Sequence, residues 1–81
     1  MVEVFKTNVK DQGHAKILVD QIHAMFGEYT ANFDLEDCDK ILRVVSPDGF
    51  INTSRLMKLL NNYGFRAEVL PDDIPEVSFL N

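Results

Sequence analysis

The stretch of sequence that decides the fold is residues 29 to 45, which read Tyr29-Thr30-Ala31-Asn32-Phe33-Asp34-Leu35-Glu36-Asp37-Cys38-Asp39-Lys40-Ile41-Leu42-Arg43-Val44-Val45. The first seven residues alternate in character, and one side of the alternation is apolar: Tyr29, Ala31, Phe33 and Leu35. A period of two predicts a strand with one buried face. Residues 36–39 are a polar turn, and residues 40–45 predict a second strand. The short connection makes the two strands an antiparallel hairpin.

A strand and a helix precede this hairpin. Residues 2–9 are rich in β-branched and aromatic side chains, which favour a strand. Asp11 is placed to cap a helix that we expect to run from Gln12 to Phe26. Gly27 then stands where a left-handed residue commonly ends a helix. The buried face of the helix is predicted by its apolar residues at helical spacing: Ala15, Leu18, Ile22, Met25 and Phe26.

A helix and a strand also follow the hairpin. Residues 46–49 read Ser-Pro-Asp-Gly and predict a turn. Asn52 or Thr53 caps a second helix, which we expect to extend to Tyr63 and to end at Gly64. Residues 65–69 predict a last short strand. The buried stripe of this helix is predicted to be Leu56, Leu59, Leu60 and Tyr63.

Two helices interleaved with four strands in the order β-α-β-β-α-β predict an α+β, ferredoxin-like fold. Both helices should cover one face of a four-stranded antiparallel sheet and leave the other face open. The same topology brings three connections to one end of the domain: the loop after the first strand, the turn between the second and third strands, and the loop before the fourth strand. We therefore expect Asp11, His14, Cys38 and Phe65 to lie at that end, although they are far apart in the sequence.

Residues 1–70 are predicted to form this domain, and residues 71–81 an irregular C-terminal tail. The tail contains Pro71 and Pro75, which disfavour regular structure. Its apolar residues are candidates to dock on the domain or on a partner: Val77, Phe79 and Leu80.

The amino-acid composition and the net charge limit the classes of function that we expect. The net charge of -5 disfavours nucleic acid and anionic membrane surfaces, both of which attract basic proteins. No apolar run approaches the roughly 20 residues of a membrane span. The start of the sequence lacks the pattern of a signal peptide, and the lone Cys38 cannot form an internal disulfide. A reducing cytoplasm is therefore the expected compartment.

Two stretches carry a resemblance to a known family. One is Val9-Lys10-Asp11-Gln12-Gly13-His14, followed by Leu18 and Ile22, and the other is Gly64-Phe65-Arg66-Ala67-Glu68-Val69, preceded by Leu56 and Leu60. Over residues 2–69 the chain resembles the heavy-metal-associated domain of copper chaperones and of metal-transporting ATPases. That family reads Met-x-Cys-x-x-Cys after its first strand and Gly-Tyr-x-Ala-x-Val near its end. The resemblance implies the same fold and places Asp11 and His14 at the two cysteine positions.

The replacement of both cysteines changes the metal chemistry that we expect. Cu(I) prefers soft thiolate ligands, whereas the Asp11 carboxylate is hard. Asp11 and His14 alone make a weak site, and Cys38 or a second molecule could add a ligand for zinc or another divalent ion. The simpler interpretation is that Asp11 caps the helix and His14 is an ordinary first-turn residue. The acidic neighbours of Cys38 disfavour its thiolate form.

We therefore expect a small interaction or regulatory module that has lost thiolate Cu(I) binding and carries no cofactor. A protein partner would use the open sheet face or the end that contains Phe65, and the chain would be a monomer or a weak homodimer. The alternative function is metal binding through Asp11 and His14, with or without Cys38. The sequence shows no nucleophile beside a base, no Gly-rich phosphate loop and no paired carboxylates, so an enzyme is not expected.

Overall fold

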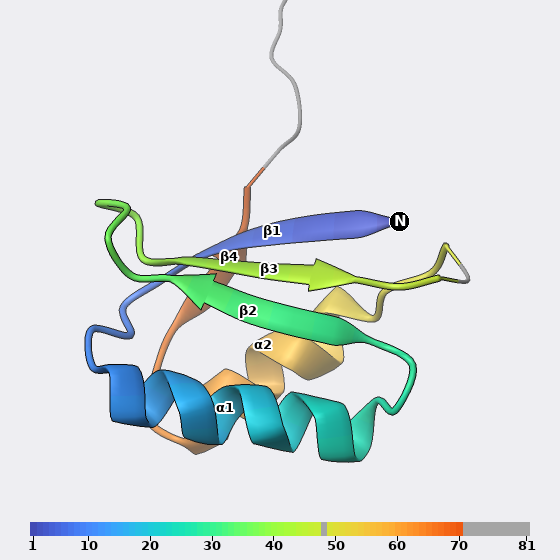
Figure 1. The fold of residues 1–81 in the computed structure, drawn as a ribbon, viewed down its shortest axis with the longest axis horizontal. Helices are drawn as coiled ribbons and strands as arrows, with labels where there is room; N and C mark the ends of the chain where they lie inside the picture. The colour runs from blue at the N-terminus through green and yellow to red at the C-terminus, as the bar shows by residue number, and fades with distance from the viewer. Residues whose placement is uncertain (48, 71–81) are drawn as a thin grey trace, which may run out of the picture.

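The computed structural model describes residues 1–47 and 49–70, and it confirms the α+β, ferredoxin-like arrangement (Figure 1). In chain order the elements are β1 (Val2–Thr7), α1 (Gln12–Met25), β2 (Thr30–Asp34), β3 (Ile41–Val45), α2 (Thr53–Asn62) and β4 (Ala67–Val69). Both helices lie on one side of the sheet, and among residues 1–47 and 49–70 no helix covers the other side (Figure 1). The predicted tail, residues 71–81, lies outside the described residues.

The four strands form one antiparallel sheet in the order β2-β3-β1-β4. The predicted hairpin is therefore present, and β2 is an edge strand. Phe5 of β1 stands opposite Leu42 of β3, which stands opposite Phe33 of β2. These three side chains point toward the helices, because Phe5 and Leu42 belong to the core and Phe33 packs against it. The neighbouring register positions consequently point to the open face.

The core lies between the sheet and the two helices. α1 contributes Ala15, Leu18 and Ile22, in agreement with the predicted stripe. α2 contributes Leu56, Leu59 and Leu60. β2 and β3 supply further core residues, among them Ala31, Leu42 and Val44.

Both helices begin with a side-chain cap. The Asp11 carboxylate accepts a hydrogen bond from the His14 backbone N–H at 3.1 Å, which confirms the predicted N-cap of α1. Asn52 caps α2 in the same way, with its Oδ1 accepting from the Arg55 N–H at 3.1 Å. Each bond satisfies one of the backbone donors that the first turn of a helix leaves free.

The end of α1 differs from the prediction. Met25 is 48% exposed rather than buried, and Phe26 is the C-cap residue instead of the last helical one. The Phe26 ring occupies the inward side, where it stacks on Tyr29 with ring centroids 4.9 Å apart. Gly27 does not adopt a left-handed conformation, because the Tyr29 N–H closes a turn on the Phe26 carbonyl instead.

The end of α2 matches the prediction in its glycine and differs in its tyrosine. Gly64 has a φ of 89°, which is the left-handed conformation expected after a helix. Tyr63 does not join the buried stripe and is 44% exposed, because it follows the last helical residue. Within residues 1–47 and 49–70, neither helix is long and apolar enough to cross a membrane.

Candidate functional site

Three connections meet at one end of the domain, as the topology predicts, and buried Thr7 joins two of them. The Thr7 hydroxyl donates a hydrogen bond to the Lys40 carbonyl at 2.6 Å and accepts one from the Val9 N–H at 3.2 Å. The Thr7 N–H donates to the Asp39 carbonyl at 3.1 Å. The end of β1 is therefore fixed against both the β2–β3 turn and the β1–α1 loop.

The third connection, between α2 and β4, is attached through Asn8. The Arg66 N–H donates to Asn8 Oδ1 at 2.7 Å, and the Asn8 N–H donates back to the Arg66 carbonyl at 3.3 Å. The Phe65 N–H bonds the Leu60 carbonyl at 2.9 Å. These bonds hold the half-buried Phe65 ring beside the start of α1.

His14 lies between the Asp11 cap and Phe65. Its ring centroid is 5.3 Å from that of Phe65, with a tilt of 52° between the rings. Its Nδ1 is 3.9 Å from Asp11 Oδ2, and both side chains are more than half exposed. The structure thus brings Asp11, His14 and Phe65 together, with the imidazole in an aromatic contact and the carboxylate engaged in the helix cap.

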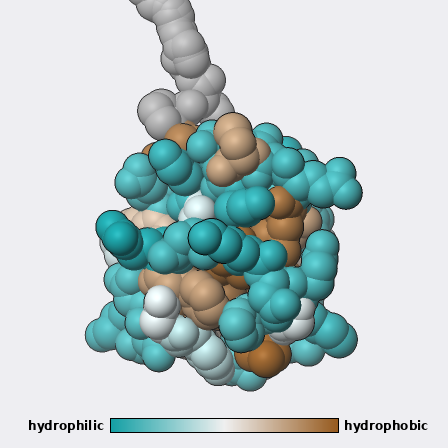
Figure 2. All heavy atoms as spheres, turned by 90° about the vertical axis from the view of Figure 1, so that its left-hand side faces the viewer, coloured by the Kyte–Doolittle hydropathy of each residue, from teal (hydrophilic) through white to brown (hydrophobic). Residues whose placement is uncertain are grey.

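A groove of about 250 Å³ lies beside this aromatic contact. Its lining is mostly apolar, formed by Ile17, Leu18 and Phe65 together with the rings of His14 and Tyr63. Ile17 is 49% exposed and Tyr63 is 44% exposed, so the groove opens onto solvent through apolar side chains. Figure 2 faces this end of the domain and shows hydrophobic surface between the hydrophilic side chains.

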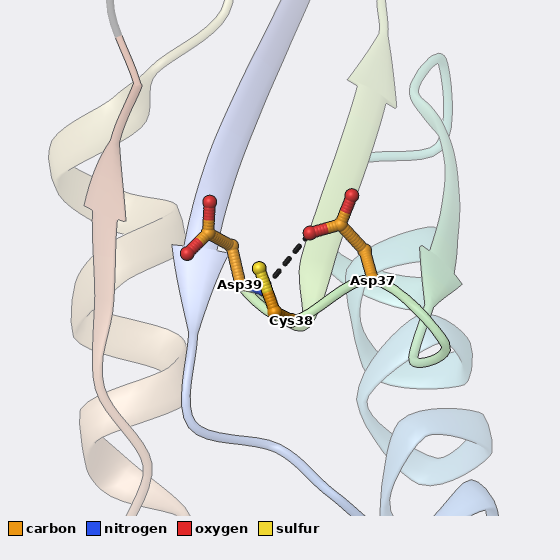
Figure 3. Close-up of side chains that lie close together, drawn as sticks. All are labelled: Asp37, Cys38 and Asp39. Atoms are coloured by element: carbon orange, nitrogen blue, oxygen red, sulfur yellow. Dashed lines mark hydrogen bonds between the residues drawn. The ribbon is translucent and has the colours of Figure 1, made fainter.

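The predicted ligand Cys38 lies in the β2–β3 turn, where it forms a group with two aspartates. One ligand atom each of Asp37, Cys38 and Asp39 lies within 4.8 Å of the others. The three side chains point to the same side of the turn (Figure 3). Cys38 is an exposed, free thiol. Among the described residues, Asp11 and His14 do not belong to a group of three such ligands.

Hydrogen bonds within the turn already use part of this group. Asp37 Oδ1 accepts from the Asp39 N–H at 2.8 Å, which is the dashed line in Figure 3. Asp39 Oδ1 lies 3.9 Å from the Lys6 ammonium. The Lys40 ammonium bonds the Leu35 carbonyl at 2.9 Å, and Lys40 has a φ of 50°. The turn is therefore held in shape by its own polar groups, and a metal ion would have to compete with them.

Two exposed residues of the groove, Ile17 and Tyr63, were not predicted as functional. Ile17 lies outside the apolar stripe of α1, and an apolar residue on the polar side of an amphipathic helix is the signal that could have identified it. Tyr63 was assigned to the core, because helical spacing alone does not show where α2 ends.

Comparison of the chain with protein-family models, with curated proteins and with solved structures finds no match. The assignment of a function therefore rests on the geometry described above. The resemblance to the heavy-metal-associated domain stays a prediction.

Proposed function

We propose that this chain is a non-enzymatic interaction module that binds a protein partner in the groove between α1 and the α2–β4 loop. The observation that carries the proposal is the apolar lining of this groove, which leaves Ile17 and Tyr63 half exposed. Exposed apolar side chains gathered around a concavity are typical of protein interaction sites.

The hydrogen bonds of the surrounding loops support the same function. Phe65 is held by the bonds of its neighbour Arg66 to Asn8, and His14 by the helix that Asp11 caps. Because these bonds already order the groove, it would lose little conformational entropy when a partner inserts an apolar side chain. Tyrosine is also among the side chains enriched in binding hot spots.

The scaffold and the cellular compartment that we propose fit this function. The chain would be a heavy-metal-associated-like domain in which Asp11 and His14 stand in place of the thiolate pair. Loss of the thiolates removes tight Cu(I) binding and leaves the loop end to a protein partner. A reducing cytoplasm suits the unpaired Cys38.

Site-specific photocrosslinking tests the interaction. Benzoylphenylalanine in place of Tyr63 should give a discrete crosslinked species in the cells from which the protein comes. The same group in place of Lys58, which is exposed on another part of α2, should not give this species. Ile17→Asp should abolish the crosslink, because it places a charge in the apolar groove.

Ala24→Asp is the matched control, because it adds the same charge at an exposed position of α1 outside the groove. Crosslinking from Tyr63 should persist in this variant. A crosslink that is equally strong from Lys58, or that is insensitive to Ile17→Asp, would contradict a partner site in the groove.

Binding of a divalent metal ion is the second candidate function. The observation in its favour is the convergence of Asp37, Cys38 and Asp39 within 4.8 Å. Calorimetric titration of the metal-free chain with zinc tests it. Saturable binding that is lost in Cys38→Ser and retained in His14→Gln would place the ion in the turn. Loss in His14→Gln would instead place it on Asp11 and His14.

A further inference from the structure

The open face of the sheet carries a group of valines around one arginine. Leu42 and Val44 of β3 point into the core, so Arg43 and Val45 point to the open face. The register places Val4 opposite Arg43, and Val2 opposite Val45. Val2 is 50% exposed, and Val4 and Val45 are only half-buried. This open-face patch, made of Val2, Val4, Arg43 and Val45, lies on the side of the sheet opposite α1 and α2 (Figure 1).

Arg43 is exposed and has no carboxylate within ion-pair distance among the residues that the structure describes. Asn32 of β2 and Val4 of β1 flank it across the sheet, and neither carries a charge. The guanidinium group is therefore available to an anionic ligand on the open face. The apolar side chains beside it favour a ligand that is also partly apolar.

Segment 71–81 of the same chain is both anionic and partly apolar. It reads Pro71-Asp72-Asp73-Ile74-Pro75-Glu76-Val77-Ser78-Phe79-Leu80-Asn81, which combines three carboxylates, no basic side chain and four large apolar residues. Its composition is complementary to a patch of one arginine and three valines.

The point at which the described chain ends places this segment within reach. The Leu70 N–H donates to the Val4 carbonyl at 2.8 Å, so the chain leaves the sheet beside the open-face patch. Val4 is directly opposite Arg43. Arg43 is therefore two strand spacings away, or about 10 Å. An extended chain covers about 10 Å in three residues, which is the separation from Leu70 to Asp73.

We propose that segment 71–81 binds in cis to the open face of the sheet. Asp72 or Asp73 pairs with Arg43, and the apolar residues that follow cover Val2, Val4 and Val45. The open face would then be occupied by the chain itself. The groove beside His14 and Phe65, which lies in the helical layer, would remain accessible to a partner.

Paramagnetic relaxation in the full-length chain tests this proposal. A spin label is attached at Ser78→Cys in a Cys38→Ser background, so that it is the only thiol-linked group. We expect loss of amide signal intensity for Val4, Arg43 and Val45, and retained intensity for α1 and α2. In Arg43→Glu the open-face signals should recover, because the pairing becomes a repulsion.

Lys58→Glu is the matched control, because it makes the same charge change on α2 and should leave the signal loss unaltered. Asp72→Asn with Asp73→Asn probes the contact from the segment and does not alter the described fold. Equal signal loss over both faces of the domain, or signal loss that survives both Arg43→Glu and the double variant, would overturn the proposal. So would signal loss that appears only between molecules in a mixture of isotope-labelled and spin-labelled chains, since the occupant would then be a second copy.

Discussion

The His23 imidazole of α1 accepts a hydrogen bond from the Ala31 backbone N–H of β2, with Nε2 3.1 Å from the nitrogen. β2 is an edge strand, so a backbone donor that is not paired with β3 would otherwise be open to solvent or to another strand. The bond therefore fastens the helix to the sheet edge and covers one exposed donor.

The first prediction is that His23→Ala weakens this attachment, because the Ala31 N–H loses its acceptor on α1. We expect a loss of about 1 kcal/mol in the free energy of unfolding, measured by urea denaturation.

The matched control is His14→Gln, which replaces the other histidine of α1 and leaves the bond between His23 and Ala31 in place. Equal stability of His23→Ala and His14→Gln would show that the bond to Ala31 makes no net contribution.

The second prediction concerns the N-cap of α1. Asp11→Ala should lower the free energy of unfolding by about 1 kcal/mol, because the His14 N–H would lose its acceptor. Asp11→Asn retains the acceptor oxygen and should lose much less. Thermal melting of the metal-free chain measures both, and an unchanged melting temperature in Asp11→Ala would mean that the cap is not needed for folding.

The parts of the fold that follow from local pattern were predictable from the sequence. The stripe of Ala15, Leu18 and Ile22 is set by helical periodicity, and it is buried as predicted. The cap at Asp11 depends only on residues within one turn, and it is also confirmed. The burial of Met25 was predicted by the same periodicity and is wrong, because the helix ends there and the Phe26 ring takes the inward side.

The third prediction contrasts two glycines that both follow helices. Gly64 has a φ of 89°, so Gly64→Ala should cost about 1 kcal/mol of stability. Gly27 is outside the left-handed region, and a Cβ there would meet nothing within 4 Å. Gly27→Ala should therefore be neutral or stabilising by up to about 1 kcal/mol. Equal destabilisation by both substitutions in thermal melts would contradict this difference in conformation.

The fourth prediction concerns the hydroxyl of Thr7. Thr7→Val preserves the shape of the side chain but leaves the Lys40 carbonyl and the Val9 N–H without this partner. We expect a loss of about 1–3 kcal/mol in the free energy of unfolding. Thr7→Ser keeps the hydroxyl and is the matched control. If Thr7→Val and Thr7→Ser were equally stable, the hydroxyl would not be what holds the β2–β3 turn.

The candidate site was predictable only as far as topology defines it. Strand order alone brings Asp11, His14, Cys38 and Phe65 to one end, and the bonds of Thr7 and Asn8 confirm that the three connections meet there. The partners of each side chain depend on distances that no sequence pattern encodes. The contact of His14 with Phe65 is one example, and the use of His23 as an acceptor for β2 is another.

The last prediction is that Cys38 does not act as a strong metal ligand. Cobalt substitution is a direct probe, because a thiolate ligand would give an intense charge-transfer band in the near ultraviolet. We expect no such band, since Asp37 Oδ1 is engaged by the Asp39 N–H and Asp39 lies beside the Lys6 ammonium. Three ligands on one exposed turn would also leave the ion largely to water. A band in the native chain would reverse the order of the two proposed functions. Its loss in Cys38→Ser alone would place the ion in the turn, whereas its loss in both Cys38→Ser and His14→Ala would place it between the turn and α1.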